Sequence, residues 1–106
     1  AVTYMDSLGG DAPAVTAALA RWACDEAADK QTSLNLPPPD AWRVELPAVP
    51  RQGNGCDCGM FALRFAECAA RGAPPDFTQA DMPALRMLMA ADAARGRVSA
   101  VPAKKG

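Results

Sequence analysis

Three consecutive prolines at residues 37–39 constrain the fold of this chain more than any other feature. Proline has a fixed φ and no N–H group, so such a run forms a stiff, extended connector that ends any helix before it. Ahead of the connector, alternating side chains predict a short strand that ends near Met5. A helix is then expected over residues 13–30, with Asp11 as its N-cap. The connector therefore separates a strand–helix segment from the rest of the chain.

The second half of the chain has the pattern of a strand, a glycine-rich loop and two helices. Apolar and charged side chains alternate over residues 42–46, which predicts a half-buried strand. The loop leads into a helix over residues 58–71, and another helix runs from about residue 78 to residue 95. This order of elements predicts an α+β domain, or part of one, in residues 1–96, followed by a disordered tail over residues 97–106.

Two apolar stripes and a small set of aromatic rings define the expected core. In the first helix, residues at helical spacing form a stripe of Val15, Leu19 and Trp22. In the second helix, the corresponding stripe consists of Phe61, Phe65 and Cys68. Because the chain has only three Phe, two Trp and one Tyr, each large ring is expected to lie in a core.

Charge and cysteine spacing exclude several classes of function. The net charge is −1 without a basic cluster, so nucleic acid is not expected as a partner. Apolar runs are far shorter than the roughly 20 residues that a membrane span needs, so no membrane contact is expected. The only close cysteine pair is the C-x-C of Cys56 and Cys58, whereas zinc sites pair C-x2-C motifs. No metal and no other cofactor is expected, and Cys24 and Cys68 are interpreted as small core residues.

Cys58 stands at the head of a predicted helix, behind the loop RQGNGCD. Unpaired backbone N–H groups and the positive end of the helix dipole favour thiolate there, which is how reactive cysteines arise. Glycines on both sides leave room for a substrate backbone. Gln52, six residues upstream, can turn its side-chain amide toward the oxyanion that forms when the thiolate attacks a carbonyl. Judged by position alone, the same cysteine also suits a small buried residue.

The run Q-x-N-G-x-D-C-G-M-F, residues 52–61, resembles the active-site segment of the ubiquitin-like-protein-specific cysteine proteases, which are the SUMO (sentrin) proteases and their adenain-like relatives. Trp42 stands where the family often has a tryptophan. Four other stretches resemble family segments in the same order: TYMDSLGG, LARWACDEAADK, FAECAARG and FTQADMPALRMLM. The likeness covers about residues 3–92. It implies a papain-like α+β fold of the adenain-like type, of which this chain forms the C-terminal half, with short strands and about three helices.

The resemblance assigns roles to three residues. Cys58 matches the nucleophile, Gln52 matches the donor to the oxyanion, and Asp6 matches the acid that orients a catalytic histidine. Asp6 taken alone also suits an ordinary turn before Ser-Leu-Gly-Gly.

Other polar residues match the family less closely. Asp57 precedes the nucleophile, and its carboxylate is expected to cap the helix or to hold the loop. Arg64 and Arg86 match basic positions only loosely, so both are expected on solvated faces. Cys56 receives no role.

The family's histidine lies a short way upstream of the aspartate, and these 106 residues contain no histidine. We expect the chain to be a fragment whose missing N-terminal half supplies this base, and to be inactive alone. The function implied is a cysteine-type isopeptidase or endopeptidase that cuts after the C-terminal Gly-Gly of SUMO or a related ubiquitin-like modifier, through a thioester, in the nucleus or cytoplasm. The alternatives are a degenerate relative that binds a modifier without cutting it, and a helical domain with only a structural role.

Overall fold

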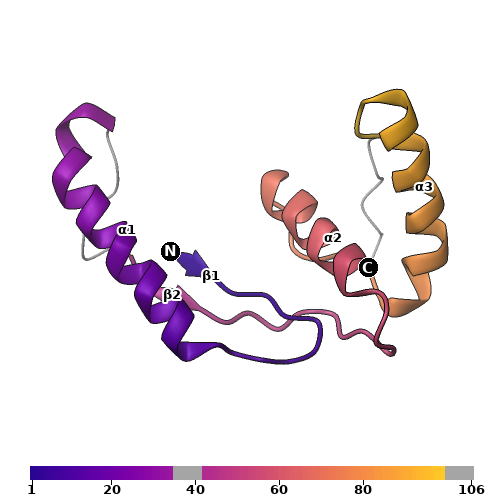
Figure 1. The fold of residues 1–106 in the computed structure, drawn as a ribbon, viewed down its shortest axis with the longest axis horizontal. Helices are drawn as coiled ribbons and strands as arrows, with labels where there is room; N and C mark the ends of the chain where they lie inside the picture. Colours follow the sequence, from indigo (N-terminus) through magenta and orange to yellow (C-terminus); the bar gives the residue numbers. More distant parts are fainter. Residues whose placement is uncertain (35–41, 100–106) are drawn as a thin grey trace. The chain divides into compact units, whose positions relative to one another are not determined.

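The computed structural model of the chain describes residues 1–34 and 42–99, which form two compact units (Figure 1). The first unit consists of residues 1–6 and 10–48, and the second of residues 7–9 and 49–106. The predicted proline connector and the last seven residues of the predicted tail lie outside the described residues. Within the described residues, short strands and three α-helices make a mixed α and β structure, consistent with the predicted α+β class.

The first unit joins two short parallel strands to one long helix. Strand β1, Val2–Thr3, pairs with β2, Val44–Glu45, with Val2 opposite Val44. Backbone hydrogen bonds extend the pairing by one residue at each end, from Val2 N to Arg43 O at 2.7 Å and from Tyr4 N to Glu45 O at 3.0 Å. Both strands occur where the sequence predicts them, but each is shorter than predicted. The prediction that the second strand is half-buried is wrong, because both residues of β2 are exposed and so is Leu46 after it.

Helix α1 spans Pro13–Leu34 and therefore continues beyond the predicted end at residue 30. Because Pro13 is the first helical residue, the residue before the helix is Ala12, with φ at 41°, and the predicted N-cap Asp11 lies one residue too early. The Thr16 hydroxyl donates to the carbonyls of Ala12 and Pro13, both at 3.1 Å. The Thr16 hydroxyl thus bonds back to the preceding turn, where the Ala12 carbonyl also accepts from the Thr16 N–H.

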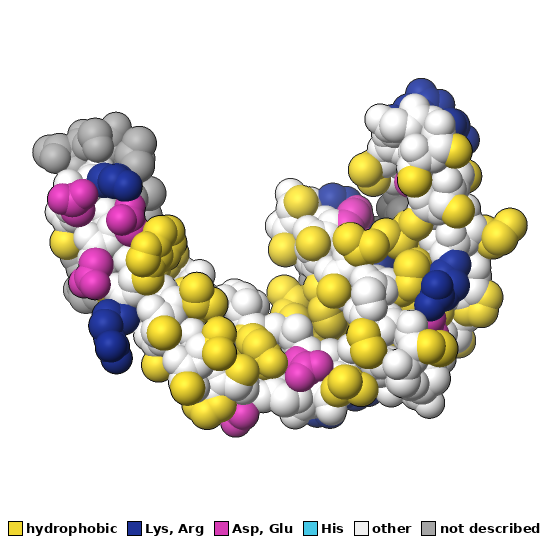
Figure 2. All heavy atoms as spheres, in the orientation of Figure 1, with side chains coloured by type: hydrophobic (Ala, Val, Ile, Leu, Met, Phe, Trp, Pro, Cys, Tyr) yellow, Lys and Arg dark blue, Asp and Glu magenta, His cyan; other side chains and the backbone are white. Residues whose placement is uncertain are grey.

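Helix α1 packs against both strands through its small residues, not through its large ones. Among residues 13–30 of this helix, whose burial is described, the buried side chains are Thr16, Ala23 and Ala27. The predicted core stripe is instead exposed, at 57% for Val15, 49% for Leu19 and 63% for Trp22. Small side chains allow the helix backbone to approach the strands closely, so the small face is the one that is covered. The prediction that every large ring is buried is therefore wrong for Trp22, and hydrophobic side chains reach the surface in Figure 2.

The core of the second unit is an aromatic cluster between α2, Cys58–Ala70, and the segment that leads to α3, Met82–Arg95. The ring of Phe61 lies 6.1 Å from that of Phe65 and 5.4 Å from that of Phe77, centroid to centroid. All three rings are buried, as is Cys68 on the same helix face. Burial of each ring contributes about 1.5–3 kcal/mol, and the tilted pairs add to this. The predicted core face of α2 is confirmed.

Local signals in the sequence end and start these helices as predicted. After α2, Gly72 adopts φ of 68° and the Ala73 N–H bonds the Cys68 carbonyl at 2.9 Å, a Schellman arrangement. A short 3₁₀ helix, η2 at Gln79–Asp81, precedes α3, and the Asp81 carboxylate accepts from the Thr78 N–H at 2.8 Å in a capping box. Gly96, with φ of 69°, ends α3.

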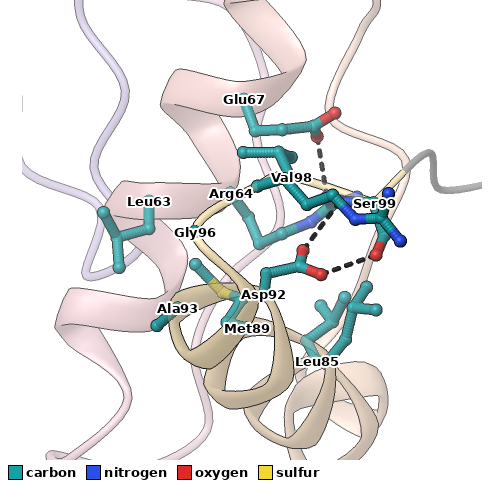
Figure 3. Close-up of a pocket in the computed structure, with 12 residues that line it drawn as sticks. Leu63, Arg64, Glu67, Leu85, Met89, Asp92, Ala93, Gly96, Val98 and Ser99 are labelled. Carbon is teal, nitrogen blue, oxygen red and sulfur yellow. Dashed lines mark hydrogen bonds and ion pairs between the residues drawn. The ribbon is translucent and has the colours of Figure 1, made fainter.

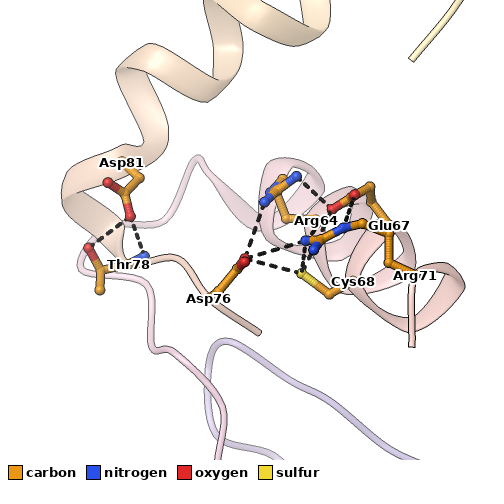
Figure 4. A network of polar contacts seen from close by, with 7 residues as sticks. All are labelled: Arg64, Glu67, Cys68, Arg71, Asp76, Thr78 and Asp81. Carbon is orange, nitrogen blue, oxygen red and sulfur yellow. Dashed lines mark hydrogen bonds and ion pairs between the residues drawn. The ribbon is translucent and has the colours of Figure 1, made fainter. Parts of the chain in front are cut away.

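Arg64 is buried, which corrects the prediction that it lies on a solvated face. Its guanidinium donates to Glu67 Oε2 at 2.7 Å and to Asp76 Oδ1 at 3.4 Å (Figure 4). It also lies over the ring of Phe77, 5.5 Å from the centroid. Hydrogen bonds from Arg71, together with the Arg64 charge, lower the pKa of the Glu67 carboxyl. Two carboxylates and an aromatic face therefore compensate the charge that burial would otherwise penalise.

The chain after α3 folds back on that helix. The Arg97 N–H bonds the Asp92 carbonyl at 3.2 Å, and the Ser99 N–H bonds Asp92 Oδ2 at 2.9 Å. Together with α2 and α3, this segment lines a pocket of about 420 Å³, whose polar side chains include Arg64, Glu67, Asp92 and Ser99 (Figure 3). The boundary of the predicted tail at residue 97 stays a prediction, since residues 100–106 are outside the described part.

None of the helices described here combines the length and the apolar character needed to cross a membrane. Over residues 1–34 and 42–99, acidic, cysteine and histidine side chains do not gather into a group that could hold a metal ion.

Candidate active site

Cys58 is the first residue of α2, and its side chain is exposed. The first hydrogen bond inside the helix runs from the Phe61 N–H to the Asp57 carbonyl at 3.0 Å. The N–H groups of Cys58, Gly59 and Met60 therefore precede the intrahelical ladder. Asp57 occupies the N-cap position but makes no side-chain cap bond, so its carboxylate does not cover these donors. The thiol thus lies at the positive end of the helix dipole, where the sequence predicts it.

Gln52 directs its side-chain amide at this thiol. The distance from Gln52 Nε2 to Cys58 Sγ is 3.2 Å, and the same nitrogen donates to the Asn54 carbonyl at 2.6 Å. Because a backbone carbonyl only accepts, the amide must present its nitrogen to Asn54 and, with it, to the sulfur. On the other side, the Ser7 hydroxyl donates to Gln52 Oε1, and the Gln52 N–H donates to the Ser7 carbonyl at 3.0 Å. Both the orientation and the backbone of Gln52 are therefore held.

This geometry suits attack on a carbonyl. An oxygen bonded to a carbon that the sulfur has attacked would lie within a few ångströms of that sulfur. The amide of Gln52 and the N–H of Cys58 are two nearby donors that can stabilise such an oxyanion. The catalytic roles of Cys58 and Gln52 stay predictions, but the two side chains are in contact.

Asp57 holds the loop beneath the thiol. The carboxylate is buried, and it accepts hydrogen bonds from Asn54 Nδ2 at 2.8 Å, from Gln79 Nε2 at 2.8 Å and from Arg86 Nε at 3.0 Å. These bonds, led by that from Asn54, lower the pKa of the Asp57 carboxyl from 3.8 to about 2. Of the two expected roles, capping the helix is wrong and holding the loop is confirmed.

Asn54, Gln79 and Arg86 are the site residues that sequence reasoning missed. Arg86 was expected on a solvated face, yet it bonds the Asp57 carboxylate and the Cys56 carbonyl while its side chain stays 50% exposed. The signal was present, because Gln79 and Arg86 both lie in the matching stretch FTQADMPALRMLM. What was missing was any indication that this stretch contacts the loop.

Two glycines beside the thiol have open space around them. A Cβ built on Gly55 or Gly59 would meet no atom within 4 Å. Packing within this chain therefore does not demand glycine at either position. The space is consistent with the expected passage of a substrate backbone.

Asp6 belongs to the first unit, whereas Gln52 and Cys58 belong to the second. Its carboxylate accepts from the Gly10 N–H at 3.0 Å and from the Tyr4 hydroxyl at 3.4 Å. These contacts describe a turn residue, which is the simpler interpretation offered by the sequence. The role of Asp6 toward a histidine stays a prediction.

Comparison with known proteins is consistent with this geometry. Residues 1–100 match the Ulp1 protease family, C-terminal catalytic domain. Ubiquitin-like-specific protease 1A of Arabidopsis thaliana is 40% identical over 85 residues, or 78% of this chain and 16% of that protein. A sentrin-specific protease of Caenorhabditis elegans is 38% identical over 90 residues, covering 83% and 12%. Sentrin-specific protease 2 of Homo sapiens is 36% identical over 87 residues, covering 81% and 15%. The chain thus spans 12% to 16% of the length of these relatives.

Proposed function

Because this chain belongs to the Ulp1 protease family, we propose that it supplies the nucleophile and the oxyanion donor of a cysteine protease that acts on SUMO or a related ubiquitin-like modifier. The observation that carries the proposal is the 3.2 Å contact between the Gln52 amide and the Cys58 sulfur at the start of α2. The names of the relatives, ubiquitin-like-specific and sentrin-specific proteases, support the substrate class.

The proposed reaction is acyl transfer. The Cys58 thiolate attacks the carbonyl of the modifier's terminal glycine, and the negative charge that forms on the oxygen is stabilised by the Gln52 amide and the Cys58 N–H. Expulsion of the amine, which takes up a proton, leaves a thioester. Water then attacks the thioester, releasing the carboxylate and regenerating the thiol.

The resemblance assigns the proton transfer to a histidine, and these 106 residues contain none. We assign this base to a part of the protein outside the chain, and Asp6 to orienting it. The isolated chain is then inactive. In this proposal, residues 1–96 form the C-terminal part of a papain-like catalytic domain, and the protein works in the nucleus or cytoplasm.

The test uses the complete protein that carries this chain and a SUMO substrate with a fluorogenic group after Gly-Gly. The wild-type protein should release the fluorophore, and Cys58→Ser should abolish release. A modifier with an electrophile at its C-terminus should label Cys58 and leave Cys24 and Cys68 unlabelled. Binding of the modifier without release or labelling would support the non-catalytic alternative instead. Turnover by the isolated chain at the rate of a complete protease would contradict the assignment of the base.

A further inference from the structure

A continuous series of hydrogen bonds links helix α3 to the amide at the thiol. We propose that Arg86, assisted by Gln79, is a positioning residue that sets the Gln52 amide against Cys58 by way of Asp57 and Asn54. The role in turnover rests on the proposed function, whereas the positioning itself is a property of this chain.

The first link joins α3 to the residue before the nucleophile. Arg86 donates through Nε to Asp57 Oδ1 at 3.0 Å and through Nη2 to the same oxygen and to the Cys56 carbonyl, the latter at 3.2 Å. The planar guanidinium thereby donates to a carboxylate and a neighbouring carbonyl simultaneously. A lysine ammonium on a flexible stem holds such a pair of acceptors less firmly. Asp57 is only 5% exposed, so its charge depends on these partners.

The second link passes from Asp57 into the loop. Asp57 Oδ2 accepts from Asn54 Nδ2, while Asn54 Oδ1 accepts from the N–H groups of Cys56 at 3.2 Å and Asp57 at 3.1 Å. Every polar atom of the Asn54 side chain is thus used, which leaves it one orientation. Gln79 adds a second support, donating to Asp57 Oδ2 and accepting from the Gly53 N–H at 2.7 Å.

The last link reaches the thiol. The Asn54 carbonyl accepts from Gln52 Nε2 at 2.6 Å, and this nitrogen is the one that faces Cys58 Sγ. A shift of the Asn54 backbone therefore shifts the oxyanion donor. Gly53 and Gly55 on either side of Asn54 give this segment wide backbone freedom, so without side-chain supports it would move.

In the described part of the chain, the Arg86 side chain donates hydrogen bonds to Cys56 and Asp57 at the end of this loop, and this side chain is half exposed. The aromatic cluster that stabilises the unit forms without it. Loss of Arg86 should therefore loosen the loop more than it destabilises the helices. Misplacement of a reacting group by about 1 Å can cost on the order of 10²-fold in rate.

The decisive experiment measures hydrogen exchange of the Gln52 side-chain amide by NMR in this chain, with isotopically labelled glutamine. The Gln52 signal is identified by its loss in Gln52→Met. In Arg86→Leu the exchange should accelerate by roughly tenfold, as expected when a hydrogen-bonded amide opens more often. Arg86→Lys should restore part of the protection. Arg95→Leu, which removes an ion pair with Asp92 on the same helix, is the matched control and should leave the exchange unchanged.

Two results would overturn the inference. One is unchanged exchange at Gln52 in Arg86→Leu. The other is equal acceleration in Arg95→Leu, which would mean general loosening of α3. If circular dichroism shows that Arg86→Leu does not fold, Gln79→Leu removes the uncharged support and should give a smaller change in the same direction; no change there would also refute the inference.

Kinetics of the complete protein then separate the two proposals. Arg86→Leu should lower kcat on the order of 10²-fold with little change in KM, because the substrate still binds while the donor is misplaced. A complete wild-type protein without turnover would defeat the proposed function, yet the exchange measurement would still decide whether Arg86 positions Gln52. If the wild type is active and Arg86→Leu raises KM without lowering kcat, the result would count against the positioning role.

Discussion

Replacing Gln52 by methionine should remove the oxyanion donor while keeping a side chain of similar length. The amide makes one contact with the Cys58 sulfur at 3.2 Å, one hydrogen bond to the Asn54 carbonyl, and accepts one from Ser7. Two donors serve the oxyanion in the proposed mechanism, and loss of one such donor typically costs 10²–10³-fold in kcat, or about 2.7–4 kcal/mol. We therefore expect kcat to fall by that factor, with KM nearly unchanged because the donor acts mainly in the transition state.

The cost of the same substitution to folding is expected to be smaller. Two side-chain hydrogen bonds are lost, each contributing roughly 0.5–1.5 kcal/mol, and the bond to Asn54 is exposed so that water can replace it. Urea unfolding of the chain should thus show a loss of about 1–2 kcal/mol at most. The rate is measured in the complete protein with the fluorogenic SUMO substrate, and Met87→Ala serves as the control because that side chain is 76% exposed. A loss of kcat below about tenfold in Gln52→Met would refute the role of Gln52 as the donor.

The remaining predictions concern the core, the helix start and acid stability. Phe61→Ala should lower the free energy of unfolding by about 3–5 kcal/mol, since the ring is fully buried between two others. Met87→Ala should change it by less than about 0.5 kcal/mol, because Met87 is exposed. Equal losses for the two variants in urea unfolding would contradict the assigned core. Gly59→Ala should raise the free energy of unfolding by about 0.4–1 kcal/mol, because space is open around this glycine. The same change should lower turnover by obstructing the substrate. An unimpaired kcat/KM would argue against passage of the substrate backbone beside Gly59. The pKa of Asp57 is lower in the folded chain, so its contribution to stability is complete above pH 3.8 and is lost as the pH falls toward 2. Thermal melts over that range should show a steeper loss for wild type than for Asp57→Asn, and parallel curves would be the contrary result.

The sequence by itself determined where helices begin and end in the second unit, and it predicted which residues would carry the chemistry. Gly72 and Gly96 stop their helices, and Thr78 with Asp81 starts the next one, because each signal acts within one or two turns of its own backbone. The motif over residues 52–61 likewise identified the family and brought Gln52 and Cys58 together, since only a short loop separates them.

The tertiary structure alone decided which faces are covered and which charges are buried. The sequence correctly predicted that Val15, Leu19 and Trp22 lie on one face of α1, but the prediction that this face is buried is wrong. Periodicity shows that a helix face is apolar, and it does not show whether another element covers that face. The side of α1 with Thr16, Ala23 and Ala27 is covered because its small residues admit the strands. Arg64 was misjudged because its burial depends on Asp76 and on the ring of Phe77, which are 12 and 13 residues away. Arg86 is exposed, as expected, but its bond to Asp57, 29 residues away, was not foreseen. Such pairings depend on how separate segments dock, and local sequence carries no record of that docking.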